Sequence, residues 1–475
     1  MLEEIINLYN QNKLKEANFL CNKIVKNNLN FHELLIISTI KLKIKEFNIA
    51  IELVKKAIKL EPYNYFAYNS LAICYVETKK FNLAEQYYEK AIKLAPEDFR
   101  IYNNLALLQE KLLKRENVIK NLKKSIELNP NYSQAHTNLG KIYYENKFYK
   151  KAKFHLNIAS NLDPYDYLAR WNLSLIFLEQ EQFLKGWHYY EYGKKCNKRL
   201  DLKFKFGETW DGKKILYDKK ILVYTEQGIG DIIHFARYLN LLSKKGCYIF
   251  FQVTENLKYL FKGIAPNTKI INNKEPTPKI NYYCNLMSLP YLLNQNSKNV
   301  LNKVPYIFLP EQSSKKWAKF LNFKELKIGI CCNAKKNDKT FRSFGVNHLK
   351  EIYELKNLRL ISLEKNSNYK SVFPNILEFK NIDKTTAFKD TAAIISNLDL
   401  VISCDTSIAH LSGALGKKTF LLLNYKSDFR WGMRKSKSLW YPSVQLFRNK
   451  KFNEWHESFK KIYNYLRINN HVNYN

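Results

Sequence analysis

Residues 401–416 bring together side chains that could bind an anion. The stretch begins with an apolar, β-branched segment, which predicts a buried strand of a parallel sheet. Asp405 then occupies a helix N-cap position, and the residues from Thr406 keep helical spacing up to Gly416, which fits the residue that ends a helix. His410 lies one turn after Thr406 on the same helix face. Because the first N–H groups of a helix are unpaired and lie at the positive end of its dipole, this stretch predicts a phosphate-binding site.

A purely structural role explains the same residues without a ligand. Asp405 would then only cap the helix, and His410 would be a hydrogen-bonded histidine of the core. For these residues taken alone, the structural role is the better explanation. The choice between the two roles therefore depends on the rest of the chain.

A second stretch of this kind lies earlier, directly after the apolar segment 221–224. It combines an amide, two glycines and a carboxylate: Gln227, Gly228, Gly230 and Asp231. The pattern predicts a tight turn that leads from a strand into a helix over 232–242. A dinucleotide fingerprint would need a third glycine where this chain has Ile233, and the sequence holds no P-loop motif either.

Both stretches lie in a part of the chain where strands and helices alternate. From about residue 213 we expect strands in two halves: 221–224, 247–253 and 304–309, then 327–331, 358–363 and 419–423. We also expect helices over 385–398 and 452–466. Such alternation predicts parallel sheets. Each half is long enough for one domain, so the pattern predicts two facing Rossmann-like α/β domains with a ligand cleft between them.

The first 200 residues show a different pattern, a 34-residue period. Prolines recur at this spacing: Pro62, Pro96, Pro130 and Pro164. The unit that starts at Tyr65 carries small and aromatic residues where two helices would touch: Tyr68, Leu71, Ala72, Tyr75, Ala84, Tyr88 and Ala91. This pattern resembles tetratricopeptide repeats and implies an α-solenoid. We expect a worn half-unit around Ala17 at its start and a last unit from about Tyr167 to Tyr192.

Repeats of this kind stack into a continuous core and present a concave surface to peptides or partner proteins. We therefore expect a protein partner for this part of the chain. A solenoid that only positions the next domain is the alternative.

Composition narrows the environment of the protein. No run approaches 18 apolar residues, and the first residues lack the features of a signal peptide. The eight cysteines are scattered without C-x-x-C spacing, which favours a reducing compartment over a disulfide framework or a structural zinc site. The net charge of +35 suits phosphates or an anionic membrane face, but no basic cluster interleaves with aromatic residues as in a nucleic-acid groove. We expect a cytoplasmic protein that does not bind nucleic acid, and leave peripheral contact with the inner membrane face open.

Two runs carry a resemblance to a known family. The run from Thr225 to Leu239 resembles the N-terminal loop of glycosyltransferase family 9, the heptosyltransferase-like group. The run from Asp390 to Leu411 resembles the donor site of that family, in its branch fused to tetratricopeptide repeats. The resemblance implies a GT-B fold of two Rossmann-like domains. It also implies an inverting transfer of a hexosyl or heptosyl group from a nucleotide-diphosphate sugar, without a metal ion or another cofactor.

The resemblance implies roles for both stretches. Asp231 corresponds to the residue proposed as general base, and at a helix N-terminus it should be ionised at pH 7 and a mild base, although a capping role is compatible. Its neighbours form the acceptor-side loop: Gln227, Gly228 and Gly230. The donor motif matches three residues: Asp405, Thr406 and His410.

A transfer without metal needs a cation beside the leaving diphosphate. Arg342, with the neighbouring Ser343, is the first candidate, because a guanidinium can bond two phosphate oxygens. Lys336 is the second candidate, and an exposed loop position is the alternative for Arg342.

One segment departs from the family. Relatives usually carry Trp and Gly after the strand that here ends in Cys331-Cys332-Asn333. This leaves a second hypothesis open, in which the repeats act as a protein-binding scaffold and the transferase part is degenerate. For the enzyme, the acceptor could be a glycan or a protein.

The resemblance and the patterns together predict four segments: a repeat array at 1–198, a linker at 199–218, an acceptor-side Rossmann-like domain at 219–310 and a donor-side Rossmann-like domain at 311–475.

Overall fold

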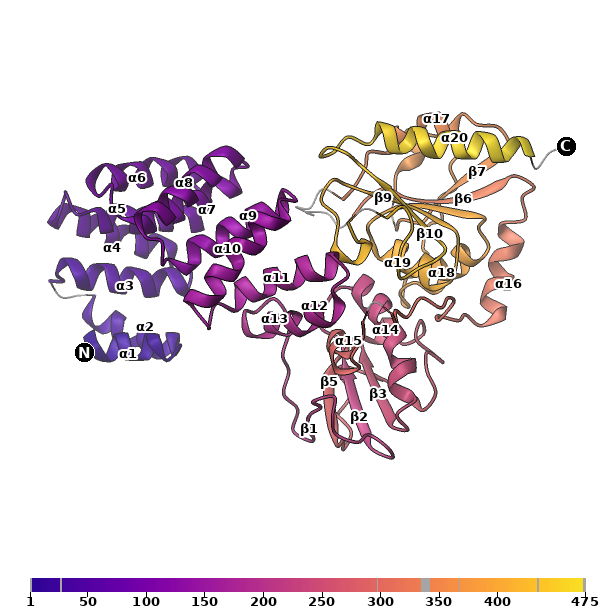
Figure 1. The fold of residues 1–475 in the computed structure, drawn as a ribbon, viewed down its shortest axis with the longest axis horizontal. Coiled ribbons are helices and arrows are strands. Elements are labelled where there is room, and N and C mark those ends of the chain that lie inside the picture. The colour runs from indigo at the N-terminus through magenta and orange to yellow at the C-terminus, as the bar shows by residue number, and fades with distance from the viewer. Residues whose placement is uncertain are drawn as a thin grey trace. The chain divides into compact units, whose positions relative to one another are not determined.

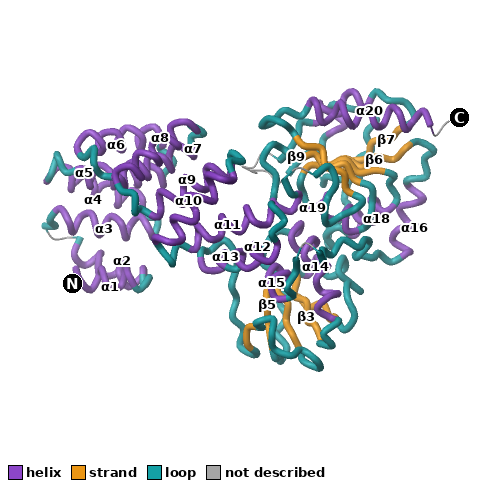
Figure 2. Tube along the Cα trace, viewed as in Figure 1, coloured by secondary structure: helices purple, strands orange, loops and turns teal. Residues whose placement is uncertain are grey.

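A computed structural model of the protein describes residues 2–25, 28–296, 298–334, 342–365, 367–433 and 435–472. The chain forms two compact units, Met1–Ala169 and Arg170–Asn475. The first unit is helical, whereas the second is built on two sheets (Figures 1 and 2). The predicted fold class, a helical repeat array followed by two Rossmann-like domains, is confirmed.

The first unit is a stack of antiparallel helix pairs (Figure 1). Its helices follow one another through short turns: α1 (Leu2–Asn10), α2 (Leu14–Ile24), α3 (Phe31–Lys43), α4 (Phe47–Leu60), α5 (Tyr65–Glu77), α6 (Phe81–Leu94), α7 (Phe99–Lys111), α8 (Arg115–Leu128), α9 (Ser133–Glu145) and α10 (Tyr149–Leu162). The half-unit expected around Ala17 is a complete helix pair, because Ile5 on α1 and Ala17 on α2 are both fully buried in one core.

The 34-residue period of the sequence reappears as a period of contacts. Three side chains in register each bond to the carbonyl oxygen of the proline six residues earlier: Tyr68, Tyr102 and His136. The alanines at the helix contacts have no exposed surface: Ala50, Ala57, Ala84, Ala91, Ala152 and Ala159. Small residues at these positions let the two helices of a unit approach closely, so that neighbouring units share a continuous core.

The first half of the second unit holds a five-stranded parallel sheet. Its strands are β1 (Glu208–Thr209), β2 (Lys220–Tyr224), β3 (Tyr248–Val253), β4 (Thr268–Asn272) and β5 (Tyr282–Asn285), in the order β1-β5-β2-β3-β4. Its helical segments are α14 (Ile229–Ser243), η1 (Glu255–Leu257), η2 (Leu286–Ser288) and α15 (Leu289–Leu292). Ile221 and Val223 on β2 share a core with α14, as alternation along a strand requires.

The second half holds another five-stranded parallel sheet. Its strands are β6 (Leu326–Cys331), β7 (Leu358–Ser362), β8 (Leu400–Cys404), β9 (Thr419–Leu423) and β10 (Val444–Arg448), in the order β10-β9-β8-β6-β7. Helices cover both faces (Figure 1): α16 (Glu311–Phe320), α18 (Lys389–Ser396) and α19 (Ser407–Ala414) on one, α17 (Lys350–Tyr353) and α20 (His456–Val472) on the other. Short 3₁₀ turns complete this half: η3 (Val346–Leu349), η4 (Tyr369–Ser371) and η5 (Phe429–Trp431).

The topology places a switch point in each sheet. In the first sheet the chain moves from β2 to β3 on one side and later returns to β5 on the other. In the second sheet it moves from β6 to β7 and returns to β8. Ligands of open parallel sheets bind at the carboxyl ends of the strands at such points. The topology therefore predicts ligand sites at the ends of β2 and β5 and at the ends of β6 and β8.

The segment 304–309, expected as a strand, joins neither sheet. Its Val304–Pro305 peptide bond is cis, and the Tyr306 N–H donates to the carbonyl oxygen of Ala414 at 3.0 Å. The first sheet is completed instead by β5, which was not predicted, and β1, β4 and β10 were not predicted either. Strands β1 and β5 are short, and polar residues interrupt β4 and β10, so these strands lack the apolar runs that mark β2, β8 and β9.

Two helices start later than expected. Helix α18 begins at Lys389 instead of residue 385, because the Asp383 carboxylate accepts the N–H of Asp390 at 2.7 Å and so sets the first turn there. Helix α20 begins at His456 instead of residue 452, because Asn453 is held at a positive φ of 62°.

The predicted linker at 199–218 packs into the second unit. Trp210 is 1 % exposed, and Leu202 and Phe204 pack against the face of β2 that carries Leu222. The last helices of the predicted array behave in the same way: α12 (Phe183–Tyr190), α13 (Tyr192–Lys195) and most of α11 (Tyr167–Glu179) belong to the second unit. None of the helices in the described part of the chain is long and apolar enough to cross a membrane.

Candidate active site

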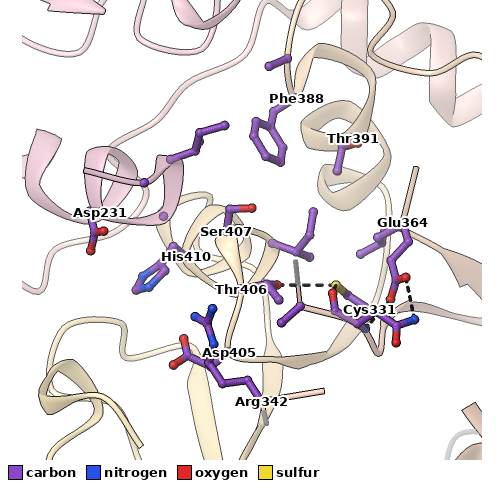
Figure 3. A pocket seen from close by; sticks show the side chains of 18 of the residues that line it. Asp231, Cys331, Arg342, Glu364, Phe388, Thr391, Asp405, Thr406, Ser407 and His410 are labelled. Atoms are coloured by element: carbon purple, nitrogen blue, oxygen red, sulfur yellow. Dashed lines mark hydrogen bonds between the residues drawn. The ribbon is translucent and has the colours of Figure 1, made fainter. Parts of the chain in front are cut away.

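The second unit contains a cavity of about 1720 Å³ at the carboxyl ends of its strands. All predicted site residues that the structure describes line it: Gln227, Gly228, Gly230, Asp231, Arg342, Ser343, Asp405, Thr406 and His410. Lys336 lies outside the described residues. Figure 3 shows how side chains from both halves meet there. Among the residues that the structure describes, no three His, Cys, Asp or Glu side chains are grouped so that they could hold a metal ion.

Helix α19 presents its N-terminus to the cavity, one residue later than expected. Thr406, not Asp405, is the N-cap, because Thr406 still has an extended backbone and the helix begins at Ser407. The Thr406 hydroxyl lies 3.4 Å from the Ser403 hydroxyl and 3.5 Å from the Cys331 thiol (Figure 3). The Ala409 N–H donates to the Thr406 carbonyl oxygen at 3.1 Å, so the N–H groups of Ser407 and Ile408 are the ones at this helix end that suit an anion in the cavity.

Asp405 is a buried carboxyl group on the cavity wall, only 6 % exposed. Burial raises its pKa to about 6, and the neighbouring charge of Asp428 adds to the shift, while Arg342 opposes it. Figure 3 shows Arg342 beside Asp405. Asp405 and Arg342 therefore line the same cavity, and Asp405 has no capping role.

Asp231 lies in the first turn of α14, whose N-cap is Gly228. Its side chain is 21 % exposed and is ion-paired with Arg430. Burial raises the pKa of Asp231 even though Arg430 lowers it. Asp231 is therefore not the cap residue, and it is a stronger base than an exposed aspartate at a helix end would be.

Arg430 is a site residue that the sequence analysis missed. It lies in η5, after β9, and its side chain is 8 % exposed. It pairs with Asp231 and, at 2.6 Å, with Asp428, and both carboxylates raise its pKa further. Nothing in the sequence separates this arginine from the many basic residues of the surface, so only the fold identifies it.

His410 and Gly230 mark the contact between the two helix ends. The His410 ring stacks on Trp431 at 4.9 Å and its Nδ1 lies 3.0 Å from the Tyr441 hydroxyl. Burial and nearby arginines lower the pKa of His410 well below its usual value, so the ring is neutral. A Cβ on Gly230 would lie 2.9 Å from His410 Cδ2, so glycine permits α14 to approach α19. His410 has the contacts of the structural role while it lines the cavity.

The segment after β6 is held by its own hydrogen bonds. The Glu364 carboxylate accepts the N–H groups of Cys332 and Asn333 at 2.5 and 2.7 Å. The Ser343 hydroxyl accepts the N–H of Ala334 at 2.8 Å. Glu364 was not predicted, and Arg342, next to Ser343, lines the cavity.

Comparisons with known proteins match the helical repeats and the sheet-containing part of the chain to two different families. Residues 65–98 and 99–132 match models of the tetratricopeptide repeat, and residues 267–461 match the model of glycosyltransferase family 9 (heptosyltransferase). A curated relative is Protein FlbA of Caulobacter vibrioides, 23 % identical over 294 residues, which are 55 % of this chain and 48 % of FlbA. The chain thus spans about half the length of the curated relative that it matches.

Solved structures resemble the repeat part of the chain. The structure of MamA is 22 % identical, covers 34 % of this chain and 95 % of MamA, and has a TM-score of 0.30. The structure of YrrB, described as a tetratricopeptide-repeat protein with an unusual peptide-binding site, is 19 % identical, covers 37 % of this chain and 91 % of YrrB, and has a TM-score of 0.28. The family models show that the chain combines tetratricopeptide repeats at 65–132 with a glycosyltransferase family 9 domain at 267–461.

Proposed function

We propose that the protein is a glycosyltransferase that moves a hexosyl or heptosyl group from a nucleotide-diphosphate sugar to an acceptor hydroxyl, with inversion and without a metal ion. One observation carries the proposal. The N-termini of two helices, one from each half of the second unit, meet at one cavity. Helix α14 brings Asp231 to it, and α19 brings Thr406 together with the preceding Asp405. One end suits an anionic donor, and the other supplies a base.

The donor side follows from the electrostatics of α19. The diphosphate would lie at its N-terminus, where N–H groups and the dipole favour negative charge. Arg342 lines the same wall and would bond the phosphate oxygens. The buried Asp405 carboxylate would then accept hydrogen bonds from hydroxyl groups of the sugar or the ribose.

The transfer itself needs one base and one stabilised leaving group. The acceptor oxygen attacks the anomeric carbon on the face opposite the diphosphate, which inverts that carbon. Asp231 takes the proton of the acceptor hydroxyl as the new carbon–oxygen bond forms. The bond to the phosphate oxygen breaks, its electron pair leaves with the diphosphate, and the α19 N-terminus and Arg342 stabilise the charge that develops. The raised pKa of Asp231 strengthens it as a base.

The repeats would bind a partner protein or bring the acceptor to the enzyme, because stacked repeats present an extended binding surface. Nucleotide sugars are made in the cytoplasm, so the proposed reaction takes place there or at the inner membrane face.

Donor turnover tests this function. The full chain is incubated with ADP-, UDP- and GDP-sugars in the presence of EDTA, and the released nucleoside diphosphate is measured. We expect release with one donor class, and Asp231→Asn should reduce it by about 10² or more, as loss of a general base does. Equal release by wild type and Asp231→Asn would remove Asp231 from the reaction.

A second candidate function is a protein-binding scaffold with a degenerate transferase domain. One observation favours it: Glu364 already occupies the N–H groups of Cys332 and Asn333, so these groups are not available to a phosphate. The scaffold predicts that no nucleotide sugar is turned over and that no nucleoside diphosphate binds.

A further inference from the structure

The switch point of the first sheet is filled by the chain itself. Arg199 inserts a fully buried guanidinium at the ends of β2 and β5. It donates to Glu226 at 2.6 Å, just after β2, and to Asn285 at 3.1 Å, at the end of β5. It also donates to Ser288 at 3.0 Å. The position where an open parallel sheet takes its ligand is therefore occupied by an arginine side chain.

This arginine fastens the last repeat helices to the turn that leads from β2 into α14, the helix that carries Asp231. It pairs with Glu191, between α12 and α13, at 2.7 Å, and its guanidinium lies over the Tyr190 ring at 4.7 Å. Glu226, its other partner, lies in this turn, directly before Gln227, and has no exposed side-chain surface. Buried charges of this kind cost free energy unless their geometry is well satisfied, and a satisfied network fixes one arrangement.

The helices fixed in this way form one wall of the cavity. Trp171 and Leu175 on α11 and Tyr190 on α12 line the same cavity as Asp231. The Trp171 ring packs on Tyr190 with centroids 4.5 Å apart. Gly193 makes room for it, since a Cβ there would lie 2.4 Å from Trp171 Cζ3. Trp171 is thus held in one orientation at the cavity, and it remains partly exposed.

The repeat period shows that this tryptophan departs from the pattern of the array. In the three preceding units the residues at the same position are polar: Asn69, Asn103 and Thr137. The aromatic residue stands only in the unit that borders the cavity. The cavity also exceeds the roughly 300–1,000 Å³ of a usual single-ligand site, so it has room for an acceptor beside the donor.

We propose that the wall formed by Trp171, Leu175 and Tyr190 is the acceptor subsite and that it takes a sugar ring stacked on Trp171. This proposal rests on the proposed function. A sugar ring has an apolar face of C–H groups and an edge of hydroxyls. The first matches the electron-rich face of an indole, and the second matches polar groups that line the same cavity, such as Gln227 and Asp428.

A polypeptide acceptor fits this wall less well. Extended peptides gain affinity by pairing with a strand edge. The wall consists of α11 and α12, whose backbone groups are bonded within helices, and it offers no strand edge.

The test measures sugar binding and nucleotide binding side by side on the full chain. Wild type, Trp171→Ala and Trp171→Phe are applied to an oligosaccharide array in saturating nucleoside diphosphate, and the nucleoside diphosphate affinity of each is measured by calorimetry. Phe154→Ala is the control, because Phe154 is a 61 % exposed aromatic residue of the array outside this cavity. We expect Trp171→Ala to lose at least tenfold in oligosaccharide affinity and Trp171→Phe to retain part of it. Nucleotide affinity should stay unchanged in all variants, which also shows that they fold.

Other outcomes overturn the proposal. Wild type that binds a nucleoside diphosphate but no oligosaccharide would reject the sugar subsite and leave the proposed function in place. Unchanged oligosaccharide affinity in Trp171→Ala would remove Trp171 from the subsite, and Trp171-dependent binding to a peptide array would identify a polypeptide acceptor. Absence of nucleotide binding in wild type would reject both proposals.

Discussion

The switch points of the two sheets in the second unit are equivalent positions, but one is filled by a side chain and the other is open. At the switch point of the first sheet, β2 and β5 end on Arg199, which is buried and fully paired. At the switch point of the second sheet, β6 and β8 end on Cys331 and Asp405, which line an open cavity. The comparison shows that the same topology can hold the last repeat helices in one half and open onto a cavity in the other. The half with the open switch point is the one that we propose to bind the donor.

Removal of the Arg199 guanidinium from the switch point of the first sheet should have the largest effect on stability. Arg199→Met leaves Glu226 buried without its partner, and removal of one member of a buried pair costs about 3–5 kcal/mol. Chemical denaturation should show this loss of unfolding free energy. Adding Glu226→Gln to Arg199→Met should recover part of it, because no uncompensated charge remains. A change below about 1 kcal/mol in the single variant would mean that Arg199 does not hold the switch point.

The open switch point should respond to pH through Asp405. Its pKa is about 6 in the folded protein and its ordinary value is 3.8, so the folded state binds the proton more tightly. Stability from this group is therefore present at low pH and is lost as the pH rises from about 4 to about 6. Asp405→Asn should be more stable than wild type at pH 7 by up to about 3 kcal/mol, and the difference should vanish near pH 4. A variant less stable at pH 7 would show that the carboxylate is satisfied in the folded protein.

The contact between α14 and α19 should be most sensitive to substitution at Gly230. Gly230→Ala places a Cβ 2.9 Å from His410 Cδ2, and such overpacking costs about 1–3 kcal/mol. Because it separates α14 from α19, it should reduce transfer more than donor affinity. Gly228→Ala is the matched control, since its Cβ would meet Asp231 Oδ2 at an ordinary 3.7 Å. Equal loss of activity in both variants would show that the spacing of the helix ends is not what matters.

Sequence patterns predicted the parts of this fold that local physics determines. The strand before Asp405 is apolar apart from Ser403, Gly416 takes the left-handed conformation at the helix end, and the 34-residue period follows from helices that cannot bury one face alone. The cap was placed one residue early because aspartate is among the preferred cap residues, whereas the turn after β8 gives that position to Thr406.

The residues that sequence analysis missed act through tertiary contacts. Arg199 and Arg430 are two of 78 Lys and Arg residues, and nothing beside them in the sequence indicates burial. Each acquires its role from carboxylates far along the chain, Glu226 for Arg199 and Asp231 for Arg430. The predicted linker was misjudged for the same reason, because its charge conceals the burial of Arg199 and Trp210. The assigned roles of Asp231 and Asp405 stay predictions until they are measured.

Nucleotide binding by wild type and two variants tests the central claim, that α19 binds the donor and α14 supplies the base. Thermal unfolding is measured with ADP, UDP, GDP and CMP for wild type, Asp405→Ala and Asp231→Ala. A true ligand at about 100 times its dissociation constant adds about 2.7 kcal/mol to the stability. The account predicts stabilisation by one nucleoside diphosphate, lost in Asp405→Ala and retained in Asp231→Ala. No stabilisation by any nucleotide, or a loss confined to Asp231→Ala, would contradict it.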